Sequence, residues 1–279
     1  MHDTCKRALG SARERTVAIL RRLWAIALLL TALAIACAGP PTPTTAPTPT
    51  PVPPTPTPPP DPALLLEATA ANLRALKSTE FMVRHETGAI FIPGFSAKMT
   101  EASGSWDSVQ GAELAVDAYL VPDAQTEAES GVYLQMLSVI TPDAYYATDP
   151  LSGAWMKQPP AMSPIPVDRL NLLAADLIAG VSDPVLGGQE SLDGQSAHRI
   201  SGEAPATLLD WLPLFPEEGQ VVQIEVWTDV EQKTLRKLRL AGPVGAFDQP
   251  DTVREILLTN IDGTVTIQPP DEFVDLTGG

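Results

Sequence analysis

Hydrophobic and polar positions follow a helical period in two segments of the chain. In "DPALLLEATAANLRALKS" the apolar residues fall on one face, Asp61 is placed to cap the helix, and Pro62 suits its first turn. The segment "VDRLNLLAADLIAGV" has the same spacing from Leu170 to Val181, with a broad apolar stripe. The pattern therefore predicts two amphipathic helices about 90 residues apart in the sequence.

Between and after these helices the pattern changes to a period of two, which is typical of strands bounded by Gly, Pro and Asp clusters. The predicted strands are "EFMVRHE", "AIFIPG", "AKMTEASGSWD", "ELAVDAYLV", "GVYLQMLSVIT", "AYYAT", "PVLGGQESL", "QSAHRISGE", "QVVQIEVWTD", "TLRKLRLAG" and "TVREILLTNI". A turn at Asp262-Gly263 leads into a further predicted strand, "TVTIQPP", and "APATLLDWL" predicts a short helix. The run Gly131–Thr141 is apolar on both alternations, so both of its faces are expected to be covered.

The order helix, strands, helix, strands does not favour a parallel α/β sheet. It predicts an α+β fold with one large, curved antiparallel β-sheet, an unclosed half-barrel, and helices packed on its concave face. The 219 residues of 61–279 are long enough for a single domain with a substantial core.

The N-terminal residues 1–36 have the pattern of a lipoprotein signal peptide. Six Lys and Arg residues precede the 14-residue apolar run Leu23–Ala36, which is too short for a permanent membrane span and ends in "LAIAC". This ending resembles a lipobox and predicts that Cys37 receives the lipid. Two alternatives remain open: the apolar run stays as an anchor, or cleavage elsewhere releases the domain. In each case the basic end predicts an extracytoplasmic location for the rest of the chain.

The predicted lipidated Cys37 begins a Pro/Thr-rich stalk, 37–60. Its segment "PPTPTTAPTPTPVPPTPTPPP" cannot form a core, because proline fixes φ and removes amide donors. We therefore expect an extended spacer between the membrane and the domain.

The composition after Cys37 excludes several classes of function. Removing the signal leaves 12 basic and 32 acidic residues, a formal net charge of −20, which argues against nucleic acid as a partner. No cysteine remains beyond Cys37, so neither a disulfide nor a cysteine metal site is expected, and no cofactor or metal is predicted. The membrane is expected to be reached through the lipid anchor, and the domain is expected to be a monomer.

An enzyme is not predicted. Only His85 and His198 remain after Cys37, and neither an HExxH motif nor a P-loop occurs. The serines of "GFSAK" and "GQSAH" lack the second glycine of a nucleophile elbow. The acidic pair in "FPEEG" reads as a solvated turn.

A family resemblance extends over nearly the whole domain. The segments "LRALKSTEFMVRHETG", "LLAADLIAGVSDPVLGGQESLDGQSAHRISGEAP", "VVQIEVWTD" to "TLRKLRLAG", and "ILLTNIDGTVTIQPP" resemble, in order and spacing, the LppX/LprAFG lipoproteins. The resemblance implies a LolA-like half-barrel, related also to LolB, with an apolar cavity for acyl chains. It further implies a protein that carries or presents lipids or glycolipids, for which a membrane transporter is a candidate partner.

A carrier of this kind must shield acyl chains from water, and an apolar cavity does so without a catalytic group. The predicted lining residues are apolar and come from strands and from the second helix: Leu134, Met136, Trp155, Leu173, Leu177, Ile224 and Trp227. Each could equally fill an ordinary core. The second helix is the predicted lid or wall of the cavity. The alternative function is an extracellular module that binds a protein or a wall polymer with the same fold and a closed interior.

Overall fold

The computed structural model describes residues 58–92, 95–212 and 214–277. These residues belong to one compact unit, Pro58–Gly279. The predicted signal peptide, Cys37 and most of the predicted stalk lie outside the described residues and stay predictions. The helices and strands of the unit are α2 (Pro62–Ala75), β1 (Ser78–Thr87), β2 (Ile90–Ile92), β3 (Ala97–Asp107), β4 (Gly111–Leu120), β5 (Val132–Ile140), β6 (Tyr145–Thr148), β7 (Trp155–Gln158), α3 (Leu170–Ala179), β8 (Ser182–Leu192), β9 (Gln195–Pro205), β10 (Val221–Asp229), β11 (Leu235–Ala241), β12 (Val253–Thr259) and β13 (Val274–Asp275).

Both predicted helices form, and their ends follow the sequence signals. The Asp61 side chain accepts a hydrogen bond from the Ala63 amide, 2.9 Å away, and Pro62 is the first residue of α2. Helix α3 begins at Leu170, because the preceding residues Val167–Arg169 form a 3₁₀ turn, and its C-cap is Gly180. The third predicted helix is a single 3₁₀ turn at Ala206–Leu209. No helix among the described residues is long and apolar enough to cross a membrane.

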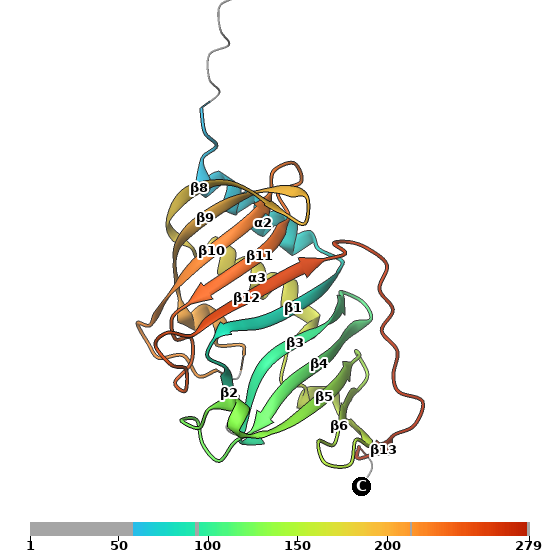
Figure 1. The fold of residues 1–279 in the computed structure, drawn as a ribbon. Helices are drawn as coiled ribbons and strands as arrows, with labels where there is room; N and C mark the ends of the chain where they lie inside the picture. The colour runs from blue at the N-terminus through green and yellow to red at the C-terminus, as the bar shows by residue number, and fades with distance from the viewer. Residues whose placement is uncertain (1–57, 93–94, 213, 278–279) are drawn as a thin grey trace, which may run out of the picture. The chain divides into compact units, whose positions relative to one another are not determined.

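The strands form one open sheet made of two meanders. The first runs β1, β3, β4, β5, β6, β7 and the second runs β8 to β12; antiparallel pairing of β1 with β12 joins them. Only β13, which pairs in parallel with β7, departs from the antiparallel pattern in the described chain. The edge strands β8 and β13 do not meet, so the sheet is an unclosed half-barrel, as predicted (Figure 1).

The two helices pack on the same face of the sheet, called here the inner face, and lie behind the strands in Figure 1. Their buried residues, such as Leu73 and Ile178, form one core cluster with Ile200, Ile224 and Leu238 of the second meander. Trp106 of β3 joins this core, and its indole Nε1 donates to the Val167 carbonyl at 2.7 Å. That bond ties the turn before α3 to the first meander.

The C-terminal segment differs from the prediction, because "TVTIQPP" forms no strand and the hairpin predicted at Asp262-Gly263 is wrong. After β12 the chain runs along the side of the sheet to β13 (Figure 1). Ile267 packs with Val139 and Tyr146 on the face opposite the helices, and the rings of Tyr146 and Phe273 meet edge to face at 5.2 Å. Burial of these side chains against β5 and β6 replaces the strand pairing that the sequence pattern suggested.

This segment also explains the apolar run of β5. Val139 and Ile140 are buried, which confirms the expectation of two covered faces at that end of the strand. At the other end Val132 is 68% and Tyr133 54% exposed, so the expectation is wrong there. On the outer face the difference arises because the C-terminal segment packs on Val139 and leaves Tyr133 exposed, whereas Val132 lies on the inner face with Leu134 and Met136.

A buried hydroxyl pair links α2 to the sheet. The Thr69 and Thr228 hydroxyls are hydrogen-bonded at 2.7 Å, and Thr69 also bonds the Leu65 carbonyl at 2.8 Å. Both residues are fully buried. Removing one of these two hydroxyls leaves the other buried without this partner. That lowers the free energy of unfolding more than replacing both hydroxyls by apolar groups of the same shape.

We therefore predict that Thr69→Val lowers the free energy of unfolding by about 1–2 kcal/mol, because the Thr228 hydroxyl loses its helix partner. The double variant Thr69→Val, Thr228→Val is expected to lose less than the sum of the single variants. Urea denaturation of the four proteins of this cycle measures the coupling. Strict additivity of the two losses would show that the pair does not link helix and sheet.

Candidate functional site

A continuous row of apolar side chains crosses the inner face of the sheet. The row is defined by cross-strand register, since directly paired residues of neighbouring strands point to the same face. Its members, from β8 to β5, are Leu186, Ile200, Val226, Leu238, Ile256, Val83, Ala102, Val116 and Met136. The inner row thus connects both meanders through the β1–β12 pair.

Burial along the inner row is uneven. Under the helices Ile200 and Val226 are fully buried. Beyond the β11–β12 boundary the small Ala102 is buried, but the larger Val83, Val116 and Met136 are only half-buried. The helices therefore cover one part of the inner face and leave apolar surface partly accessible on β1, β4 and β5. Such a surface is the candidate binding site.

The predicted lining residues divide between the two faces of the sheet. Leu177 of α3 and Ile224 of β10 lie in the core between helix and sheet, Leu134 and Met136 lie on the inner face of β5, and Leu173 is half-buried on α3. Their role as cavity lining stays a prediction. A small cavity of about 10 Å³, which is enough for one water molecule, lies beside the end of α2.

Two predicted lining residues, Trp155 and Trp227, lie on the opposite, outer face. Trp227 follows Val226 of the inner row, and neighbouring residues of a strand point to opposite faces. Trp155 packs with Val139 and Tyr146 under the C-terminal segment. Placing these two tryptophans beside Ile224 in one cavity was therefore wrong, because hydrophobicity alone does not fix which face a strand residue takes.

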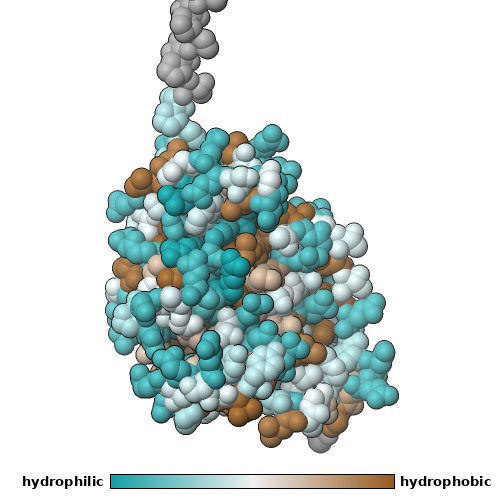
Figure 2. Space-filling model, viewed as in Figure 1, coloured by the Kyte–Doolittle hydropathy of each residue, from teal (hydrophilic) through white to brown (hydrophobic). Residues whose placement is uncertain are grey.

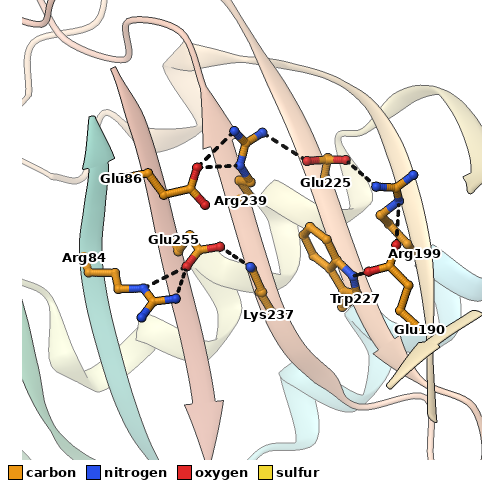
Figure 3. Close-up of polar contacts among 9 residues, drawn as sticks. All are labelled: Arg84, Glu86, Glu190, Arg199, Glu225, Trp227, Lys237, Arg239 and Glu255. Carbon is orange, nitrogen blue, oxygen red and sulfur yellow. Dashed lines mark hydrogen bonds and ion pairs between the residues drawn. The ribbon is translucent and has the colours of Figure 1, made fainter. Parts of the chain in front are cut away.

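The outer face has a polar network in place of an apolar row, and Figure 2 shows this face as largely hydrophilic. Four acids, four bases and one tryptophan from six strands form a chain of contacts (Figure 3). Its members, in order of contact, are Arg84, Glu255, Lys237, Trp227, Glu190, Arg199, Glu225, Arg239 and Glu86. We call it the outer network.

Glu255 is the most buried member of the outer network. Its side chain is 2% exposed and contacts both Arg84 and Lys237, and the Arg84 Nε lies 2.8 Å from its Oε2. Burial raises the pKa of the Glu255 carboxyl, but the hydrogen bonds from Lys237 and Arg84 outweigh burial and lower that pKa to about 2. The Lys237 ammonium also lies 4.8 Å from the centre of the Trp227 ring, a cation–π contact.

A second buried polar group lies on the inner face, and the sequence analysis missed it. Arg254 pairs in register with Leu240 of the core, and its guanidinium contacts Asp248. The Arg254 Nε donates a hydrogen bond to His85 Nε2 at 3.2 Å. The side chains of Arg254 and Asp248 are 4% and 3% exposed. In "TVREILLTNI" the pattern places Arg254 among the polar residues of a half-exposed strand. No sequence signal therefore distinguished it from a solvent-exposed arginine.

The other polar residues considered in the sequence are not brought together. His85 and His198 lie on β1 and β9, with three strands between them. Glu217 and Glu218 are exposed, as predicted. The described residues contain no group of three or more His, Cys, Asp or Glu side chains arranged to hold a metal ion.

The fold defines the class to which the chain belongs: unclosed antiparallel half-barrels with helices on the concave face. The family model described as LppX_LprAFG lipoprotein matches residues 61–268. The chain belongs to this lipoprotein family, which confirms the resemblance drawn from the sequence.

The chain is similar to several solved structures, and LprF shares its fold. LprF from Mycobacterium bovis is 16% identical, with a TM-score of 0.55 over 75% of this chain and 96% of that one. LppX from Mycobacterium tuberculosis is 15% identical, with a TM-score of 0.48 over 75% of this chain and 100% of that one. A LolA superfamily protein from Nitrosomonas europaea is 9% identical, with a TM-score of 0.25 over 75% and 95% of the two chains. No curated protein sequence matches the chain.

The outer network leads to a prediction about stability. We expect Glu255→Gln to lower the free energy of unfolding at pH 7 by about 2–4 kcal/mol, because two cations lose the carboxylate that they share in a buried position. Since folding lowers the pKa of Glu255, its contribution is present above a pH of about 4.5 and is lost as the pH falls towards about 2. The difference between variant and wild type is therefore expected to shrink in acid.

Asp176→Asn is the matched control for this measurement. Asp176 pairs with Arg74 at 3.0 Å, but the two side chains are 59% and 45% exposed, so the expected loss is below about 1 kcal/mol. Urea denaturation of the three proteins between pH 7 and pH 3 gives the comparison. Equal losses for the two variants would contradict the role given to burial.

Proposed function

We propose that this lipoprotein binds a lipid or glycolipid through its acyl chains on the inner face of the sheet and carries or presents it outside the cytoplasm. The observation that supports this most is the inner row, which continues as half-buried apolar surface beyond the helices. Contiguous apolar surface that stays accessible to water is typical of a binding site.

The energy available is sufficient for the proposed ligand. Burial of each methylene of an acyl chain is worth about 0.8 kcal/mol, so a 16-carbon chain offers roughly 12 kcal/mol before ordering costs. The turn before α3 is tied to β3 by the Trp106–Val167 hydrogen bond, and Leu172 of α3 is 44% exposed. We propose α3 as the wall or lid, since a shift of this helix would change the width of the accessible apolar surface. The proposal requires no catalytic group.

We also propose that the domain is held at the membrane by a lipid on Cys37, with residues 37–60 as the stalk. The expected result of Cys37→Ser is loss of labelled palmitate from the protein and its release from the membrane fraction, because the apolar run before Cys37 is too short for a stable span. Metabolic labelling and membrane fractionation of a bacterial host test this. Retention of the Cys37→Ser protein in the membrane would support the uncleaved anchor instead.

The lipid proposal is tested on the Pro58–Gly279 unit, which contains every described helix, strand and core cluster. We expect native mass spectrometry to find a co-purified lipid near one to one. Met136→Lys is expected to weaken binding of a fluorescent fatty acid about tenfold or more, because it places a charge in the path of the acyl chain.

Gln135→Lys is the matched control, because Gln135 directly precedes Met136 in β5 and points to the outer face. Its side-chain amide donates a hydrogen bond to the Asp117 carboxylate at 3.0 Å. This variant is expected to bind like the wild type, and circular dichroism checks that both variants are folded. Equal loss in both variants would remove the inner face as the site. A folded domain that neither contains nor binds lipid would favour the protein or wall-polymer module.

A further inference from the structure

Two buried polar atoms without a hydrogen-bond partner lie near the start of β12, two residues apart. They are Nη1 of Arg254 and Oγ1 of Thr252. Arg254 is 3% exposed and Thr252 is fully buried. Leaving a buried polar atom unpaired destabilises a folded protein, most of all when the group is charged, so each of these two atoms calls for a physical reason.

Asp248 and His85 hold the rest of the Arg254 guanidinium. Asp248 Oδ2 accepts the amides of Val244 and Gly245 at 2.8 and 3.0 Å, in addition to the Arg254 guanidinium. His85 Nδ1 lies 3.0 Å from the Thr100 carbonyl, which accepts its proton, so Nε2 is left to accept from Arg254. Arg254 is thus held by two partners while one of its amino groups stays available.

The charge of this group is balanced. Burial lowers the pKa of His85; the hydrogen bond to Thr100 opposes this, and the neighbouring Arg254 lowers the pKa further, so the imidazole is neutral at neutral pH. The positive charge of Arg254 is matched by Asp248. An anion brought here would add an uncompensated negative charge, whereas a neutral oxygen acceptor would pair with the free N–H at no such cost.

The group also lies next to the inner row. Arg254 and His85 are two residues from Ile256 and Val83 along the same strands, and they point to the same face. The loop between β11 and β12, which includes Asp248, lies over this end, and its Phe247 meets Phe91 edge to face at 5.6 Å. A ligand lying along the inner row would therefore have its polar end beneath this loop.

We propose that Arg254 and Thr252 bind the uncharged oxygen atoms of a lipid head, namely the ester carbonyl or hydroxyl of a neutral glycerolipid or glycolipid. This inference rests on the proposed lipid-binding function and specifies its ligand class. Arg254 Nη1 donates to the acceptor oxygen, the Thr252 hydroxyl completes the contact, and the acyl chains extend from there along the inner row. Phe247 and its loop move outward to admit the head.

The test compares three pyrene-labelled probes on the Pro58–Gly279 unit: a diacylglycerol, the phosphatidic acid with the same chains, and a plain alkane. We expect the wild type to bind the diacylglycerol best. Thr252→Val, which keeps the side-chain shape, is expected to weaken diacylglycerol binding about five- to tenfold, and Arg254→Met tenfold or more. Alkane binding is expected to stay unchanged in both variants. Thr252→Val keeps the test valid if Arg254→Met fails to fold.

The outcomes separate this inference from the proposed function. If no probe binds the folded wild type, the lipid-binding function itself is wrong. If alkane and diacylglycerol bind equally well and Thr252→Val changes neither, lipid binding stands and the head site is overturned. If the wild type binds the phosphatidic acid more tightly than the diacylglycerol, the head site is likewise overturned, because Arg254 and Thr252 would then bind a negatively charged head.

Discussion

The pairing of β1 with β12 is the contact on which the rest of the structure depends. These strands come from opposite ends of the described chain, yet they pair in register from Glu80 with Thr259 to His85 with Arg254. Without this pair the two meanders would be separate sheets, each with an exposed edge and an apolar face too small to bury well. With it, a single row of apolar side chains runs across the inner face.

That long sheet has more inner face than two helices can cover. Helix α2 follows the sequence start of the domain and α3 lies between the two meanders, and both pack over the second meander. The first meander keeps half-buried apolar positions such as Val116 and Met136. The C-terminal segment cannot cover them, because it packs on the outer face through Ile267. The proposed binding surface is thus a consequence of chain length and topology.

The two faces of the sheet are stabilised by different physics. On the inner face, stability comes from apolar burial, with the buried ion pair of Arg254 and Asp248 as the exception. On the outer face, alternating charges of neighbouring strands pair across six strands, and only Glu255 is deeply buried among them. The outer face thus presents paired charges, whereas the apolar side chains of these strands gather on the inner face.

The sequence by itself determined most of the local elements, including both helices and the cap at Asp61. It also determined the α+β class and the family, because these depend on periodicity and turn chemistry within short segments. Strand alternation could group residues by face but could not say which group the helices cover, so Trp155 and Trp227 were assigned to the wrong side. The course of "TVTIQPP" and the group around Arg254 were decided by tertiary contacts. Such contacts join residues up to 169 positions apart, and no local pattern encodes them.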